Sequence, residues 1–309
     1  MINHIKEYTE RGWVVHPLSS PKDSGGSPGK KPLLAGWQHL KKTPGLYNFP
    51  PGCNIGLVCG KVSGVMVIDY DNLYFIADMI NDLRNENFWE TWMKTMVSKR
   101  TFERGHIFYK YDPEIKSQKH HLLGIEVLSD GSNAVIPPSI HKSGDVYKWI
   151  GAATQAIEMP DDVKERLLSL FRTETELKQI MSKCRTCFKK VLTDYPANIP
   201  DVHGADGRLF MLAICTDLVA LGAKEAHLKM FSKLVYREKY SYEKTLVGFE
   251  GIAPGKTWRC ETLREKLPAY VNCSECVNHK FSTTEHEQAG RMRMTIPASV
   301  KELTLVIEK

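Results

Sequence analysis

The chain has 309 residues, of which 42% are hydrophobic and 25% are charged. These proportions are typical of a globular protein and exclude a disordered or low-complexity chain. The 42 Lys and Arg residues exceed the 36 Asp and Glu residues, giving a net charge of +6, which is compatible with a nucleic-acid partner without establishing one. No apolar run approaches the roughly 20 residues of a membrane span, and the start lacks the apolar segment of a signal peptide. We therefore expect a cytoplasmic protein with no membrane partner, whose eight cysteines are reduced thiols or metal ligands.

The first half of the sequence predicts strands mixed with helices. A short helix should end at Gly12 and a strand should start at Trp13, followed by a Ser-, Gly- and Pro-rich loop that carries Lys30 and Lys31. The next strands are expected at residues 54–58, 64–71, 106–111, 122–128 and 133–138, with a helix at residues 73–94. This succession indicates the α+β class with a mixed or antiparallel sheet.

Beyond about residue 172 the strand pattern gives way to a helical one. Residues 174–192 and 207–236 repeat apolar side chains at helical spacing, and Gly222 stands where one helix would end and another begin. We expect a small helical domain in this part of the chain. The predicted organisation is a first domain at residues 1–172, a linker helix at 173–200 and a helical domain at 201–309.

The stretch GVMVIDYD, residues 64–71, ends a run of apolar residues with two carboxylates. Alternate side chains of a strand lie on the same face, so Asp69 and Asp71 would project together and repel each other unless a cation lies between them. Glu126 stands inside another apolar strand. A lone Glu in a strand more often faces solvent, but opposite Asp69 and Asp71 it would be a third oxygen ligand for Mg²⁺ or Mn²⁺.

The order of several short motifs is informative although each alone is weak. The chain reads GWVVHPL, KKPLLAGWQ, NIGLVCG, GVMVIDYD, RGHIFYK, GIEVLSDG and NAVIPPSIHKSGDVYKW. Over roughly residues 8–150 this succession resembles the bifunctional DNA primase/polymerase (prim-pol) family of the archaeo-eukaryotic primase superfamily. In the resemblance, Asp69 and Asp71 correspond to the paired acids, His106 to the motif histidine and Glu126 to the third acid.

The resemblance implies a prim-pol catalytic core and a function. The three acids would hold two Mg²⁺ or Mn²⁺ ions for nucleotidyl transfer. The substrates would be dNTPs or NTPs and a single-stranded DNA template on which primers are made and extended. Domains of this family typically occur in replication proteins of plasmids and viruses, so a replicative helicase domain, in the same or another chain, is a further expected partner.

The resemblance also implies a set of nucleotide-binding residues. His106 would donate a hydrogen bond to a phosphate, and Lys142 and Lys31 would neutralise further phosphate charge, with a solvated surface lysine as the alternative for each. The small residues usual before the histidine are replaced here by Phe-Glu-Arg-Gly, so that Arg104 would supply a charged phosphate contact. Of the nearby polar residues, we expect a turn-shaping role for Ser139 and His141 and a surface position for His120 and His121.

A possible zinc knuckle in the C-terminal part consists of Cys260, Cys273, Cys276 and His279. A Cys-x₂-Cys pair with two further nitrogen or sulfur ligands suits a tetrahedral Zn²⁺ site. The alternatives are free thiols without a metal, or a four-cysteine site in which Cys184 and Cys187 join the Cys-x₂-Cys pair. The cysteines in apolar contexts are expected in the core, namely Cys53, Cys59 and Cys215.

Two classes of function are compatible with these observations. The first is a DNA primase/polymerase, and the second is a catalytically idle DNA-binding or helicase-loading replication module that keeps the fold. Asp69, Asp71, Glu126 and His106 favour the enzyme, because an idle module has no reason to hold three acids together.

Overall fold

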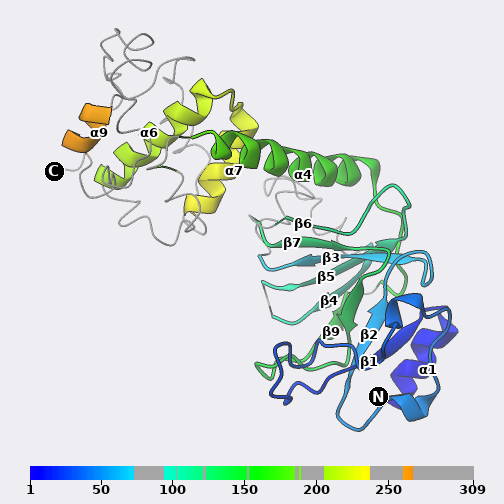
Figure 1. Ribbon diagram of the computed structural model, residues 1–309. Coiled ribbons are helices and arrows are strands. Elements are labelled where there is room, and N and C mark those ends of the chain that lie inside the picture. The colour runs from blue at the N-terminus through cyan, green and yellow to red at the C-terminus, as the bar shows by residue number, and fades with distance from the viewer. Residues whose placement is uncertain are drawn as a thin grey trace. The chain divides into compact units, whose positions relative to one another are not determined.

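The structure is a computed structural model of residues 1–309 (Figure 1). It describes residues 1–72, 94–101, 103–120, 123–151, 153–184, 188, 205–236 and 260–266. The chain divides into two compact units, residues 1–170 and residues 171–309. The division falls inside helix α4 (Asp161–Ser182), which begins before the linker helix that we expected from residue 173.

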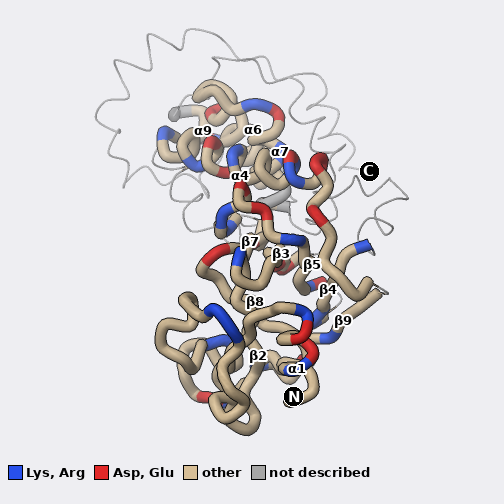
Figure 2. Tube along the Cα trace, turned by 90° about the vertical axis from the view of Figure 1, so that its right-hand side faces the viewer, with Lys and Arg blue, Asp and Glu red and all other residues tan. Residues whose placement is uncertain are grey.

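The first unit begins with a helix and a small antiparallel sheet. Helix α1 (Ile2–Glu10) ends before Gly12, whose positive φ of 81° lets the chain turn into strand β1 (Val15–Leu18). Strand β1 pairs with β2 (Asn54–Val58), and β2 pairs with β8 (Asn133–Ile136). Both views in Figures 1 and 2 place α1 beside this three-stranded sheet.

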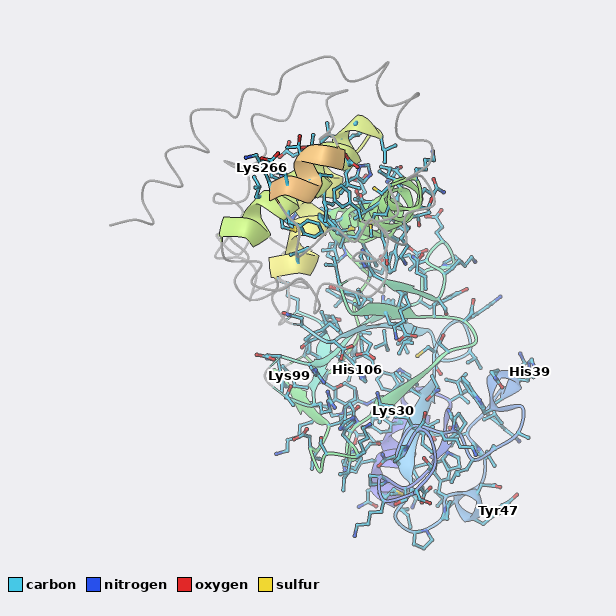
Figure 3. The ribbon with its side chains drawn as sticks, turned by 60° about the vertical axis from the view of Figure 1, so that its left-hand side comes forward. Lys30, His39, Tyr47, Lys99, His106 and Lys266 are labelled. Atoms are coloured by element: carbon cyan, nitrogen blue, oxygen red, sulfur yellow. The ribbon has the colours of Figure 1, made fainter. Side chains whose placement is uncertain are left out.

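A long loop connects β1 to β2. It contains two short 3₁₀ helices, η1 (Trp37–His39) and η2 (Leu46–Asn48), whose His39 and Tyr47 are labelled in Figure 3. The first part of the loop is fixed by Asn54, whose side-chain amide donates hydrogen bonds to the carbonyl oxygens of Gly29 (2.9 Å) and Ile140 (2.6 Å). Lys30 is therefore held close to the turn that follows β8.

The larger sheet has six strands in the order β6-β7-β3-β5-β4-β9, and each neighbouring pair is antiparallel. Strand β3 (Val65–Tyr70) lies between β7 (Ile125–Leu128) and β5 (Gly105–Lys110). The outer strands are short: β6 (Gln118–His120), β4 (Met96–Lys99) and β9 (Lys148–Ile150). Together with the helices, these antiparallel sheets confirm the expected α+β class.

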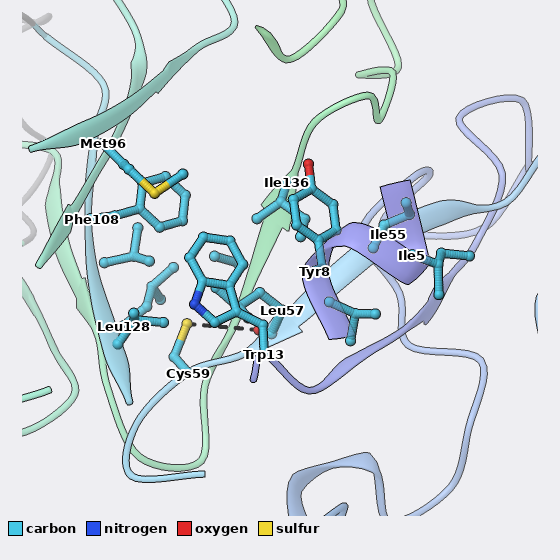
Figure 4. Close-up of a cluster of buried hydrophobic side chains, with 14 residues drawn as sticks. Ile5, Tyr8, Trp13, Ile55, Leu57, Cys59, Met96, Phe108, Leu128 and Ile136 are labelled. Atoms are coloured by element: carbon cyan, nitrogen blue, oxygen red, sulfur yellow. Dashed lines mark hydrogen bonds between the residues drawn. The ribbon is translucent and has the colours of Figure 1, made fainter. Parts of the chain in front are cut away.

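The main hydrophobic core lies between the two sheets and α1 (Figure 4). Val67 and Phe108 of the large sheet pack with Ile55 and Leu57 of the small one, and all four side chains are at most 1% exposed. Trp13 stacks on Phe108 with ring centroids 5.9 Å apart. Burying each such side chain contributes about 1.5–3 kcal/mol, so this core holds the two sheets together.

The opposite face of the six-stranded sheet is also apolar, because alternate residues of β3 and β5 such as Ile68 and Ile107 are fully buried. The start of α4 is tied to the loop after β5 by Lys164, which donates hydrogen bonds to Asp112 and Glu114, both at 2.6 Å. The helix expected at residues 73–94 lies outside the described residues except for its last residue.

The described part of the second unit is helical. Besides the rest of α4, it contains α6 (Ala205–Ala220), α7 (Glu225–Tyr236) and α9 (Cys260–Lys266). Gly222, with φ of 97°, lies between α6 and α7 as the sequence predicted. Phe210, Ile214 and Leu218 of α6 are fully buried. Among the described helices, none combines the length and apolar character needed to cross a membrane.

Candidate active site

A row of side chains crosses the six-stranded sheet at the level of Asp69. Asp69 lies directly opposite Glu126 on β7 and directly opposite His106 on β5. Residues that face each other in antiparallel strands place their side chains on the same face. The register extends this polar row to both outer strands, and from β6 to β9 its members are Lys119, Glu126, Asp69, His106, Ser98 and Trp149.

Asp71 is placed by the turn that leads into β7. Its backbone N–H donates a hydrogen bond to the carbonyl oxygen of Gly124 at 2.9 Å. Gly124 has a positive φ of 63°, and a Cβ atom there would lie 3.1 Å from the Cβ of Asp71, so a larger residue would disturb this contact. Asp71 is the most exposed of the three acids, at 66% of its side chain, against 33% for Asp69 and 38% for Glu126.

Each of the three acids faces a different basic side chain. Asp69 Oδ1 lies 3.5 Å from His106 Nε2, and Glu126 Oε2 lies 3.6 Å from Lys119 Nζ. Asp71 Oδ1 lies 3.9 Å from Arg104 Nε. Within the described ranges, no three His, Cys, Asp or Glu side chains converge closely enough to hold one metal ion. The fold thus brings the acids to one end of one sheet face, while their side chains are directed toward three separate partners.

His106 is held firmly in the polar row. It is only 5% exposed, and its ring stacks on Tyr147 with centroids 5.6 Å apart. Its Nε2 faces Asp69, whereas its buried Nδ1 has no hydrogen-bond partner among the described residues. The preceding Gly105 is required by close packing, because a Cβ atom there would lie 2.4 Å from the carbonyl oxygen of Ser98 on β4. A side chain at residue 105 would push β4 away from β5 and move His106.

The charge state of Asp69 reflects its surroundings. Burial alone would raise the pKa of Asp69, but His106, Lys30 and Arg100 together hold that pKa below its ordinary value. Asp69 is therefore ionised at neutral pH. Burial also raises the pKa of Tyr147 to about 12, so this phenol stays neutral beside the acids.

Basic side chains from three loops gather around His141, and two of them, Lys30 and Arg100, also act on Asp69. Arg100, from the β4–β5 turn, places Nη1 2.8 Å from both ring nitrogens of His141. Burial lowers the pKa of His141, and the charges of Arg100, Lys30 and Lys142 lower it further. Lys30 comes from the β1–β2 loop, and Figure 3 labels it together with His106. The trace in Figure 2 shows basic and acidic positions interleaved along this sheet. This basic cluster, Lys30, Arg100 and Lys142, has the charge that binds phosphates.

Several sequence predictions for this site need refinement. Lys30, the neighbour of the predicted Lys31, acts on Asp69 together with His106 and Arg100, and the backbone carbonyl of Lys31 accepts a hydrogen bond from the Ser19 N–H at 2.7 Å. Ser139 has the expected turn-shaping role, because its Oγ accepts a hydrogen bond from the Ile55 N–H at 2.9 Å. The expectation that His120 lies at the surface was wrong: it is 1% exposed in β6.

Sequence reasoning missed Arg100, Ser98 and Lys119. Arg100 and Arg104 flank the tight turn in which the Arg100 N–H donates to the Arg104 carbonyl oxygen at 3.1 Å. Two arginines at the ends of a hairpin turn next to the motif histidine could have indicated that Arg100 also belongs to the site. Ser98 and Lys119 gave no comparable signal, because their strands have only four and three residues, too few to show a pattern of alternation.

The predicted zinc knuckle falls on residues that mostly lie outside the described part of the chain. Cys273, Cys276 and His279 are among the residues not described, as is Cys187, and for Cys260 only its place at the start of α9 is described. The cysteines expected in the core are buried as predicted, namely Cys53, Cys59 and Cys215.

The comparison with protein families gives a match over the first half of the chain. The family described as "Bifunctional DNA primase/polymerase, N-terminal" matches residues 5–162, just over half of the 309 residues. The matched range contains Asp69, Asp71, His106 and Glu126 together with all strands of both sheets. No curated protein sequence matches the chain. The extent of the family match, over the part of the chain that carries the polar row, shows that the chain belongs to the bifunctional DNA primase/polymerase N-terminal domain family.

Proposed function

We propose that the chain is a template-dependent DNA primase/polymerase that makes primers and extends them by two-metal nucleotidyl transfer. Family membership supports DNA and nucleotides as the substrates. The observation that carries the proposal is the register of Glu126, Asp69 and His106 on three adjacent strands, beside the basic cluster of Lys30, Arg100 and Lys142. This arrangement offers metal ligands and phosphate ligands next to each other.

Asp69, Asp71 and Glu126 would hold two Mg²⁺ or Mn²⁺ ions. Carboxylate oxygens suit these hard cations, and side chains directly opposite each other in antiparallel strands have Cβ atoms about 4.5–5.5 Å apart, within reach of a shared ion. When bound, the metal ions would stabilise charge on the attacking and leaving oxygens of the transfer. Arg104 and Lys119 would have to leave Asp71 and Glu126 for these two acids to become ligands.

The basic residues would bind the triphosphate of the incoming nucleotide. Lys30 and Arg100 already act electrostatically on Asp69, so a triphosphate in contact with them would lie next to the acids. Arg104, half-exposed and flexible, would move from Asp71 to a phosphate. His106, fixed by Tyr147, would donate a hydrogen bond to a phosphate oxygen. Lys142 and Lys31, both exposed, are further candidates for the same task.

A catalytically idle DNA-binding or helicase-loading module is the second candidate. The observation in its favour is that the three acids each face a separate basic group and do not converge. In such a module the basic cluster would bind DNA phosphates without metal ions. Both candidates are compatible with a role in plasmid or virus replication and with a replicative helicase as partner.

Labelled-nucleotide incorporation on a single-stranded DNA template distinguishes the two candidates. The reaction is run in Mg²⁺ or Mn²⁺, with dNTPs or NTPs, and with or without a preformed primer. Metal-dependent synthesis by the wild type that is lost in Asp69→Asn supports the enzyme. DNA binding without synthesis under all these conditions supports the idle module.

A structural Zn²⁺ site in the C-terminal part is a separate proposal. Its ligands would be Cys260, Cys273, Cys276 and His279, a donor set that suits tetrahedral Zn²⁺. Metal analysis of the purified chain should find about one zinc per chain and clearly less in Cys276→Ser. Equal zinc in both proteins would contradict the assignment of Cys276.

A further inference from the structure

Lys119 is the only basic member of the polar row apart from His106, and no motif of the sequence includes it. It lies on the edge strand β6, directly opposite Glu126 on β7. Its Nζ is 3.6 Å from Glu126 Oε2, and its side chain is 52% exposed. Glu126 is therefore flanked along the row by an ammonium group on one side and by Asp69 on the other.

These positions make Lys119 a competitor for the cation that Glu126 would bind. An ammonium ion and a divalent metal ion that share one carboxylate repel each other. Lys119 can move away, because it is half-exposed, has a flexible four-carbon stem, and stands on a strand that lies at the edge of the sheet among the described strands. Glu126 is itself 38% exposed, so its carboxylate can turn between the two positions.

We propose that Lys119 is a displaceable counter-ion that couples DNA binding to metal binding. In the free protein it pairs with Glu126 and weakens metal binding there. When DNA binds, the ammonium group moves to a backbone phosphate of the primer–template duplex, and Glu126 becomes available as a metal ligand. This inference rests on the proposed function, in that it takes Asp69 and Glu126 as metal ligands.

The coupling has a thermodynamic consequence that can be measured without any turnover. If Lys119 leaves Glu126 in order to bind DNA, then DNA must tighten metal binding, and metal must tighten DNA binding by the same factor. Removing the charge of Lys119 should tighten metal binding to the free protein and should reduce the further tightening caused by DNA. A lysine with only a structural role would produce neither effect.

The experiment measures Mn²⁺ binding to the full chain by electron paramagnetic resonance, without DNA and with a primer–template duplex. We expect Lys119→Gln to bind Mn²⁺ about three- to tenfold more tightly than the wild type in the absence of DNA. Added duplex should increase the Mn²⁺ affinity of this variant less than that of the wild type. Lys119→Arg, which keeps the charge, should behave like the wild type. The matched control is Lys110→Gln, because Lys110 forms a similar exposed pair with Glu158, at 3.5 Å, at the other end of β5.

Unchanged or weaker Mn²⁺ binding by Lys119→Gln without DNA would overturn the inference, as would equal tightening in Lys110→Gln. Asp69→Asn in the same titration separates this failure from that of the proposed function. If Asp69→Asn weakens Mn²⁺ binding and Lys119→Gln does not strengthen it, only the role of Lys119 is wrong. If Asp69→Asn leaves Mn²⁺ binding unchanged, the metal site itself is wrong.

Discussion

Two neighbouring rows of the six-stranded sheet have opposite chemistry although they share strands and face. The apolar row consists of Leu128, Val67, Phe108 and Met96, all part of the main core. The polar row lies two residues away on each strand and contains Glu126, Asp69, His106 and Ser98. Residues i and i+2 of a strand share a face. Each of these strands therefore contributes one side chain to the core and, two residues away on the same face, one side chain to the candidate site.

Because of this difference, substitutions in the apolar row should mainly change stability, and substitutions in the polar row should mainly change activity. The apolar row gains free energy from burial. The polar row contains the ionised Asp69 and two buried polar atoms, Ser98 Oγ and His106 Nδ1, that have no hydrogen-bond partner among the described residues. A buried polar atom without a partner costs about 1–3 kcal/mol. The polar row therefore reduces stability, and a site that binds a ligand is the expected reason.

The largest effect is expected from the acids of the polar row. Asp69→Asn, Asp71→Asn and Glu126→Gln should each reduce nucleotide incorporation about 1000-fold or more, because a lost metal ligand removes several kcal/mol of transition-state stabilisation. The free energy of unfolding should change by only about 1 kcal/mol or less, since all three acids are at least one-third exposed. A folded variant that keeps near wild-type incorporation would contradict the metal-site assignment.

Phe108→Ala tests the apolar row and should have the opposite effect, a large loss of stability with a small loss of activity per folded molecule. Phe108 is fully buried, stacks on Trp13 and lies two residues from His106. Truncation should lower the free energy of unfolding by about 3–5 kcal/mol through lost burial and a cavity, as measured by urea denaturation. The incorporation rate per folded molecule at low temperature should fall far less than in Asp69→Asn. A fully folded but inactive Phe108→Ala would show that the two rows do not separate.

Between pH 6.5 and about 4 the fold should be sensitive to acid through a buried histidine outside the polar row, whereas Asp69, whose pKa lies below its ordinary value, contributes only at lower pH. His16 on β1 is fully buried, stacked on Trp37 with centroids 4.9 Å apart, and burial lowers its pKa from 6.5 to about 4. Between these two pH values His16 is therefore protonated in the unfolded chain and neutral in the folded chain. Above pH 6.5 this protonation does not lower the free energy of unfolding. As the pH decreases from 6.5 to about 4, the free energy of unfolding should fall by about 3 kcal/mol. His16→Phe keeps the ring, and its unfolding free energy should depend less on pH in this window; an unchanged pH dependence would contradict the role of His16.

His106→Ala should affect nucleotide binding more than DNA binding. A lost hydrogen bond to a charged phosphate should weaken nucleotide binding by about 1.5–3 kcal/mol, measured by titration with a non-hydrolysable triphosphate. His106→Phe is the control that keeps the stacking on Tyr147, and it should show the same loss. Equal losses in nucleotide and DNA affinity would instead indicate that β5 has been displaced.

The strands of the site could be predicted from sequence, but their register could not. The apolar runs before Asp69 and around Glu126 marked β3 and β7, because a short apolar run is a local signal of a buried strand. The pairing that puts Asp69 between Glu126 and His106 is set by packing between segments far apart in the chain. The strands β4 and β6 escaped prediction because they have only four and three residues, and with them Ser98 and the ion pair of Lys119 escaped as well.

The sequence also could not show which of the two adjacent lysines, Lys30 or Lys31, acts on Asp69. Both lysines follow a Gly-rich loop, and their order in the sequence does not say which one faces the acids. The answer depends on the hydrogen bonds from Asn54 to the carbonyl oxygens of Gly29 and Ile140, which fix the loop against the β8–β9 connection. Such contacts between distant loops leave no periodic signal.

The smallest effect, and the sharpest test of the comparison, is expected for Ser98→Ala. Ser98 is fully buried opposite His106, and its Oγ has no hydrogen-bond partner within the described residues. Removing the hydroxyl removes its desolvation cost and leaves only a small gap, so thermal or urea denaturation should show a gain of about 0.5–1 kcal/mol. Met96→Ala, two residues away in the apolar row, should instead lose about 2–5 kcal/mol. If the hydroxyl serves the site, Ser98→Ala should also weaken nucleotide binding, so that stability and function move in opposite directions. A clear loss of stability in Ser98→Ala would mean that the hydroxyl has a stabilising partner and that Ser98 belongs to the core.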